Sequence, residues 1–133
     1  MKDTSITSEK AQLVIVEDDP FISRMYQMKI GQAGYKLAVG ENGRDAVELI
    51  TQHQPRLAMI EIHMREMGGF EVIKHLSSNG YDLSRTAFIL LTNLNNPNDI
   101  ERAKAIGAEY LIKADQTPRS ILALIQKKLD STA

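Results

Sequence analysis

Short, largely apolar runs recur along this chain, and each one ends at a glycine or a polar residue. The runs are Leu13–Val16, Tyr35–Val39, Leu57–Ile60, Ala87–Leu91 and Tyr110–Ile112. Their length and their content of large and β-branched side chains are typical of strands that are buried on both faces. The pattern therefore predicts five strands.

The segments between these runs show helical spacing. Three of them open with a capping residue followed by proline, at Asp19-Pro20, Asn96-Pro97 and Thr117-Pro118, which is a helix-start signal. Two more helices are expected after Asn42 and near Gly69. The apolar residues expected to face inward are Ala46, Val47, Ile50, Phe70, Ile73, Leu76, Ile100, Ala103, Ile106, Leu122, Ile125 and Leu129. In the first helix Phe21, Met25 and Met28 recur at helical spacing, and we expect Met25, Met28, Met59 and Met64 to pack rather than to act.

Strands and helices thus alternate along the chain. Connections long enough to hold a helix, between short buried strands, indicate a parallel sheet with helices on both faces, a doubly wound α/β fold. The 133 residues are enough for one domain. We expect residues 1–10 to be a flexible tail and residues 11–130 to be the folded domain.

Composition narrows the functional classes. The net charge is −1 and no basic block is present, which argues against direct binding of nucleic acid. The chain has no cysteine, which fits a reducing cytosol. Its longest apolar run, Ala87–Leu91, is far shorter than a membrane span. The sequence predicts a cytoplasmic domain that contacts neither nucleic acid nor membrane.

Polar side chains stand at the ends of four of the predicted strands. Glu17 and Asp18 follow the first, Glu61 follows the third, Thr92 the fourth and Lys113 the fifth. In an open parallel sheet, functional groups gather at the carboxyl ends of the strands. These five residues are therefore the candidate site.

The chemistry of this set points to phosphate. If the first and third strands are neighbours, three carboxylates meet, and two like charges 4 Å apart repel by about 4 kcal/mol near a protein surface. Such a cluster needs a cation, and oxygen ligands favour Mg²⁺. Lys113 would add a fixed positive charge and Thr92 a hydroxyl donor, a combination suited to binding or transferring a phosphoryl group.

Each residue also has a simpler interpretation. Glu17 and Asp18 could serve only to cap the first helix, and Thr92 alone could be an ordinary strand-end residue. The side chain of His63 is not expected to be a ligand. His53 and His75 are expected to be exposed to solvent.

Several motifs resemble those of the receiver domain of two-component response regulators, over roughly residues 11–130. They are Val16-Glu17-Asp18-Asp19-Pro20, Gly69-Phe70-Glu71-Val72, Leu91-Thr92, Gly107-Ala108 and Tyr110-Leu111-Ile112-Lys113. The resemblance implies a flavodoxin-like receiver fold, a five-stranded parallel sheet of order 2-1-3-4-5. It also implies a signalling domain rather than an enzyme.

The family's activity assigns expected roles by position. A histidine kinase or phosphotransfer protein donates a phosphoryl group to an aspartate that ends the third strand, the position of Glu61, with Mg²⁺ bound beside it. The implied metal ligands are Asp18 directly, Glu17 through water, Glu61, and the backbone carbonyl of His63. Lys113 would pair with the phosphoryl group, Thr92 would hydrogen-bond to it, and Thr92 and Tyr110 would form the switch. An output partner or a second copy would bind the surface of residues 97–129.

The departures from the family pattern change the functional hypothesis. Glutamate at position 61 reaches about 1.5 Å further than aspartate, and a misplacement of about 1 Å can cost on the order of 100-fold in rate. Arg65, Gly68, Asn93 and Ala114 also replace the usual residues. We therefore expect a phosphorylation-defective or phosphomimetic receiver that binds Mg²⁺ weakly.

The alternatives are a receiver that still accepts phosphate slowly and a natural interaction module that works without phosphorylation. A phosphatase-type hydrolase needs an aspartate nucleophile and a second acid two residues on, which Glu61-Ile62-His63 lacks. A dinucleotide-binding domain needs G-x-G-x-x-G after the first strand, where this chain has acids. Within the site, we expect Glu61 to pair with Lys113 rather than with Thr92, and Tyr110 to lie outward or in mixed positions.

Overall fold

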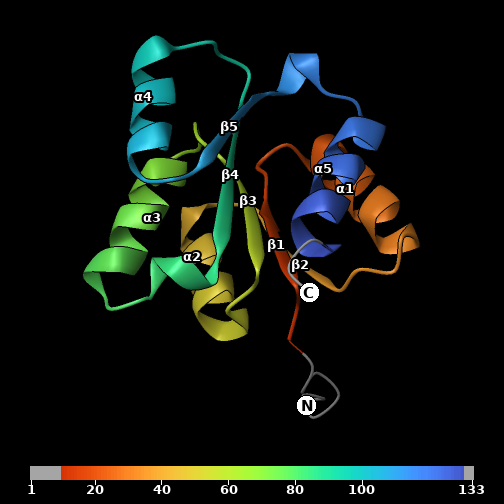
Figure 1. Cartoon of the computed structure of the whole chain (residues 1–133), viewed down its shortest axis with the longest axis horizontal. Coiled ribbons are helices and arrows are strands. Elements are labelled where there is room, and N and C mark those ends of the chain that lie inside the picture. Colours follow the sequence, from red (N-terminus) through yellow and green to blue (C-terminus); the bar gives the residue numbers. More distant parts are fainter. Residues whose placement is uncertain (1–9, 131–133) are drawn as a thin grey trace.

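The computed structural model describes residues 10–130, and within them five strands form one parallel sheet. The sheet order is β2-β1-β3-β4-β5 (Figure 1). The strands are β1 (Leu13–Val16), β2 (Leu37–Gly40), β3 (Leu57–Glu61), β4 (Ala87–Thr92) and β5 (Glu109–Ile112). The predicted fold class and the strand order implied by the resemblance are confirmed. The tail expected over residues 1–10 lies outside the described residues, apart from Lys10.

Helices cover both faces of the sheet. They are α1 (Pro20–Gln32), α2 (Gly43–His53), α3 (Gly69–Ser78), α4 (Pro97–Ala105) and α5 (Pro118–Asp130), with short 3₁₀ turns η2 (Leu83–Arg85) and η3 (Lys113–Asp115). Helices α1 and α5 lie on one side, and α2, α3 and α4 lie on the other (Figure 1). Between residues 10 and 130, no helix has the length and apolar character needed to cross a membrane.

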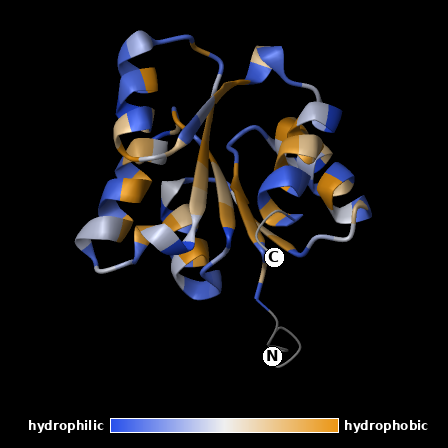
Figure 2. Ribbon diagram, in the orientation of Figure 1, coloured by the Kyte–Doolittle hydropathy of each residue, from blue (hydrophilic) through white to orange (hydrophobic). Residues whose placement is uncertain are grey.

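The central strands carry the core. Every residue of β1 and β3 is buried, and the strands form the hydrophobic centre of the molecule (Figure 2). Alternate residues point to opposite faces, so Val14 and Val16 pack toward α2 and α3, whereas Leu13 and Ile15 pack toward α1 and α5. Both layers of helices are thereby fixed against β1 and β3, the two strands that end at the candidate acids.

The predicted helix starts are present. Asp19 Oδ1 accepts hydrogen bonds from the N–H groups of Phe21 and Ile22, at 2.9 and 3.4 Å. Asn96 caps α4 in the same way, and Thr117 Oγ1 accepts from the Ser120 N–H at 3.0 Å. These side chains satisfy backbone donors that have no partner inside the helix. Asp19 is therefore the residue that caps α1, which leaves Glu17 and Asp18 available for another role.

Some of the packing predictions were wrong. Met25 and Met28 are exposed, at 43% and 59%, because α1 turns Ser23, Tyr26 and Ile30 to the sheet instead. Met59 is fully buried as predicted, and Met64 packs against the core.

Two further positions differ from expectation. Ile106 is 44% exposed because it follows the last residue of α4 and no longer lies on the buried side. His53 is only partly exposed, since its Nδ1 accepts a hydrogen bond from the Ala11 N–H at 3.0 Å. His75 is exposed as predicted.

Candidate functional site

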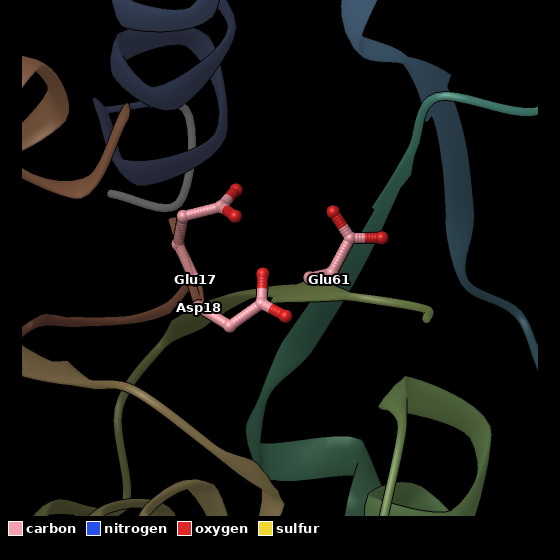
Figure 3. Close-up of side chains that lie close together, drawn as sticks. All are labelled: Glu17, Asp18 and Glu61. Carbon is pink, nitrogen blue, oxygen red and sulfur yellow. The ribbon is translucent and has the colours of Figure 1, made fainter. Parts of the chain in front are cut away.

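The acids meet because β1 and β3 are hydrogen-bonded neighbours. Their register pairs Val16 with Ile60, so Glu17 and Glu61 follow at the same edge of the sheet. One carboxylate oxygen from each of Glu17, Asp18 and Glu61 lies within 4.8 Å of the others. Figure 3 shows the three carboxylate groups directed into a common space. Glu17 and Glu61 are 1% and 4% exposed, whereas Asp18 stands in solvent at the mouth of the site.

Lys113 joins the two buried acids. Its Nζ lies 2.8 Å from Glu17 Oε1 and also contacts Glu61 Oε1, and only 9% of its side chain is exposed. The residue follows β5, two strands away from β3, and its long side chain spans the end of β4 to reach both carboxylates. The predicted pairing of Glu61 with Lys113 is present.

The second oxygen of each acid is held by the backbone. Glu17 Oε2 accepts from the Asp19 N–H at 3.1 Å, and Glu61 Oε2 accepts from the His63 N–H at 3.1 Å. Both carboxylates are thus fixed at two points, one charged and one neutral. For Glu61, neither oxygen is without a partner.

The charges do not balance within this group. Burial raises the pKa of the Glu17 carboxyl, and the ammonium of Lys113 opposes that rise. For Lys113, burial favours a lower pKa, but its contacts with Glu17 and Glu61 outweigh burial and the net shift is upward. Lys113 is therefore held in its charged form, and one ammonium faces two carboxylates.

The residues present fit a hard divalent cation. The three carboxylates of Glu17, Asp18 and Glu61 outnumber the one ammonium, that of Lys113, which contacts Glu17 and Glu61. The site opens to a cavity of about 300 Å³. Its lining residues are Glu17, Asp18, Asp19, Ile22, Glu61, His63, Thr92, Asn93, Leu94 and Lys113. Carboxylate oxygens with room for water are the donors that Mg²⁺ prefers.

Thr92 and Tyr110 engage the loop between β4 and α4. Thr92 is fully buried, and its Oγ1 accepts a hydrogen bond from the Leu94 N–H at 3.1 Å. The half-buried Tyr110 donates its hydroxyl to the Leu94 carbonyl at 2.7 Å and accepts from the Asn96 N–H at 3.4 Å. The hydroxyls of Thr92 and Tyr110 therefore hold the two backbone groups of Leu94, Thr92 at its N–H and Tyr110 at its carbonyl.

The sequence did not point to a charged group beside His63. His63 Nε2 lies 3.6 Å from Asp99 Oδ2, and the side chain of Asp99 is only 11% exposed. Arg102 Nη1 lies 3.9 Å from Asp99 Oδ1, and the guanidinium of Arg102 stacks over Phe70 at 4.0 Å. Asp99 stands in the first turn of α4, where an acid ordinarily complements the helix dipole. The sequence alone therefore gives no sign of its contact with His63.

The loop after β3 explains one departure from the family pattern. A side chain at position 68 would place its Cβ 1.9 Å from the Ile62 carbonyl oxygen, so Gly68 permits this close approach. Glu66 has a positive φ of 66°, which marks a tight turn. Asn93 lines the cavity, and Arg65 is exposed.

Comparison with known proteins gives one family. The model of the response regulator receiver domain matches residues 13–126. The polar-differentiation response regulator DivK of Brucella anthropi is 31% identical over 110 residues, which cover 82% of this chain and 89% of that protein. The probable C4-dicarboxylate response regulator DctR of Priestia megaterium is 30% identical over 117 residues. That match covers 86% of this chain, which spans only half the length of DctR.

Solved structures agree with the fold. The chemotaxis protein CheY4 of Vibrio cholerae superposes with a TM-score of 0.76 at 25% identity, covering 90% of this chain and 98% of that one. A CheY-like receiver domain protein from Methanospirillum hungatei superposes with a TM-score of 0.80 at 22% identity, covering 92% and 96%. The second similarity concerns the fold alone.

Proposed function

This chain belongs to the receiver domains of two-component response regulators, and from this premise we propose that it is a receiver that does not accept a phosphoryl group. Glu61 occupies the acceptor position in this proposal. The observation that carries it is the buried contact between Glu61 and Lys113. In this contact the ammonium of Lys113 binds the carboxylate of Glu61.

Two features of Glu61 oppose phosphoryl transfer. Its side chain is longer than that of aspartate by about one bond, roughly 1.5 Å, so its oxygens lie beyond the point at which an acceptor would attack. Both oxygens are also engaged, one by Lys113 and one by the His63 N–H at 3.1 Å. A nucleophile that must leave two partners and shift by about 1 Å loses on the order of 100-fold in rate.

Asp18 and Glu17 would hold Mg²⁺ in this proposal, Asp18 directly and Glu17 through water, with Glu61 and the His63 carbonyl beside them. The ion would supply positive charge to a site where one ammonium faces two buried carboxylates. Lys113 already occupies Oε1 of both Glu17 and Glu61. Because a divalent ion would compete with Lys113 for these oxygens, binding is weak.

The remaining roles follow the family pattern. Thr92 and Tyr110 form the switch, and the surface of residues 97–129 contacts an output partner or a second copy. A histidine kinase or phosphotransfer protein is the upstream partner, in the cytoplasm, and the chain transmits a signal rather than acting as an enzyme. If the chain binds these partners without accepting a phosphoryl group, it would compete with active receivers for them.

The test is intact-mass spectrometry after incubation with acetyl phosphate and Mg²⁺. We expect no adduct on the unmodified chain, none on Glu61→Gln, and partial phosphorylation of Glu61→Asp. A stoichiometric gain of one phosphoryl group on the unmodified chain would overturn the proposal. The alternative of slow acceptance predicts a gradual gain on the unmodified chain that Glu61→Gln lacks, so a time course separates the two.

A further inference from the structure

A cavity separate from the acidic site lies between helices α3 and α4, which are neighbours on one face of the sheet (Figure 1). Its volume is about 500 Å³, within the range of about 300 to 1,000 Å³ that is typical of small-molecule sites. Phe70, Ile73 and Leu83 line it from the side of the hydrophobic core. We call this cavity the α3–α4 groove.

A positive charge stands on each side of the groove. Lys74 lies on α3, one turn after Phe70 and on the same side of the helix, and Arg102 lies on α4. Both are exposed, and Lys74 has no acidic partner within residues 10–130. The acid Glu71 also lines the groove, but its Oε1 accepts from the Gly68 N–H at 3.2 Å. Its charge is therefore directed to the start of α3, and the two cations favour an anion in the groove.

The guanidinium of Arg102 is already oriented at the groove. It lies over the ring of Phe70, 4.0 Å from the centroid, in a cation–π contact. Its Nη1 lies 3.9 Å from Asp99 Oδ1, too far for a hydrogen bond. The side chain of Arg102 is 58% exposed. Its N–H donors are therefore open to a ligand that enters from solvent.

We propose that the α3–α4 groove binds a small aromatic carboxylate. The carboxylate would accept hydrogen bonds from Arg102, whose planar fork matches two carboxylate oxygens side by side. Lys74 would supply a second positive charge from the other helix. The ring would cover the apolar side of the groove, where a flat shape suits a guanidinium that stacks on aromatic faces.

Other occupants fit the groove less well. A protein interface usually buries about 800 Å² on each partner and depends on several large anchoring side chains. Among the described residues that line the groove, Ile106 is the only exposed large apolar side chain, at 44%. A neutral ligand would leave both cations without a counter-charge. A small inorganic anion would leave the apolar side uncovered.

The inference goes beyond the proposed function. None of the residues that line the groove contacts Glu61 or Lys113 or would hold Mg²⁺. The groove shares α4 with the surface of residues 97–129, but its occupant is a small molecule rather than a partner protein.

Two matched probes test the proposal. They are 2-naphthoate and 2-naphthamide, which share one ring system and differ in charge. Titration of the isotope-labelled full chain, followed by amide NMR, should shift signals of residues 70–78 and 102–106 with 2-naphthoate. A ligand of this size should bind with a Kd of about 1 mM or tighter. Binding of 2-naphthamide should be weaker by about fivefold, since it offers no charge to Arg102 and Lys74.

Variants place the binding in the groove. Lys74→Gln with Arg102→Gln should remove the preference for 2-naphthoate. Ala105→Trp, at an exposed position that lines the groove, should fill it and abolish binding of both probes. Lys104→Gln is the matched control, because Lys104 is a cation of α4 with a side chain 73% exposed that does not line the groove. It should leave binding unchanged, and unaltered amide signals away from α3 and α4 would show that each variant is folded.

Several outcomes would overturn the proposal. They are absence of shifts at several millimolar 2-naphthoate, shifts confined to other parts of the chain, equal binding of the two probes, and undiminished binding by Ala105→Trp. Shifts of the same signals that depend on protein concentration alone, and that Ala105→Trp abolishes, would assign the groove to a second copy. Phosphorylation of the unmodified chain would refute the proposed function without affecting this test.

Discussion

Replacing Lys113 with methionine tests the charge balance of the site most directly. Methionine keeps an unbranched apolar stem in the space of the lysine stem and removes only the ammonium. Glu17 and Glu61, at 1% and 4% exposed, would then face each other without a cation. We expect the folded state to lose much of its stability.

The size of the loss follows from the geometry. With the ligand oxygens of the acids within 4.8 Å and an effective dielectric constant of about 20, two negative charges repel by about 3 to 4 kcal/mol. Removing one partner of a buried ion pair costs about 3 to 5 kcal/mol in other proteins. These figures describe the same effect and are not added, so the free energy of unfolding should fall by about 3 to 5 kcal/mol at pH 7.

Urea unfolding, followed by circular dichroism in EDTA, measures the loss. Adding Glu61→Gln to Lys113→Met should recover most of it, because the second charge is removed. Lys128→Met is the matched control, since Lys128 pairs with Glu109 in a contact whose side chains are 32% and 41% exposed, and it should cost less than about 1 kcal/mol.

The pH dependence of Lys113→Met has a defined sign. Without the ammonium, burial and repulsion raise the folded-state pKa of Glu17 further above its unfolded value of about 4.3. The loss in free energy of unfolding should therefore be largest at neutral pH and become smaller as the pH falls toward about 4. A loss no greater than that of Lys128→Met, or no recovery with Glu61→Gln, would refute the reasoning.

Two further predictions concern metal and acid stability. Calorimetric titration should show that Asp18→Asn weakens Mg²⁺ binding more than Glu17→Gln does, because in the proposed function Asp18 is the direct ligand. Equal binding by all three proteins would show that neither acid is a ligand. His53 Nδ1 accepts from the Ala11 N–H, and the pKa of His53 is lowered by burial and then by the charge of Lys10. The stability that His53 supports should be complete above about pH 6.5 and be lost as the pH falls toward the lower pKa of His53 in the folded state. The urea midpoint of His53→Gln should therefore depend less on pH in this range than that of the unmodified chain. An identical pH dependence would contradict this assignment.

The position of the site could be predicted because it depends on where strands end. Glu17, Glu61, Thr92 and Lys113 each follow or close a short, largely apolar run, and parallel strands bring such ends to one edge. The pairing of Glu61 with Lys113 followed from opposite charge at that edge. That Lys113 also contacts Glu17 depends on the reach of one side chain, which no pattern in the sequence encodes.

The side of α1 that faces the core could not be predicted. Its helical spacing gives two rows of comparable character, Phe21 with Met25 and Met28, and Tyr26 with Ile30. The sheet selects the second row, and Ser23 is buried with it. Similarly, Asp99 fits its place in the first turn of α4 on local grounds, and only the fold brings it to His63.

In the proposed function, Glu61 is better suited to blocking the switch than to imitating phosphorylation. A phosphoryl group offers three acceptor oxygens and close to two charges, whereas Glu61 offers two oxygens, and Lys113 and the His63 N–H already engage both. The Thr92 hydroxyl is engaged by the Leu94 N–H at 3.1 Å, and Tyr110 holds the carbonyl of the same residue at 2.7 Å. Moving a population from 1:99 to 99:1 requires about 5.5 kcal/mol of preference between two states. Because Lys113 and the His63 N–H each bind one oxygen of Glu61, neither oxygen is without a partner when Thr92 approaches. In the proposed function, Glu61 therefore holds the receiver in one state whether or not a kinase is active.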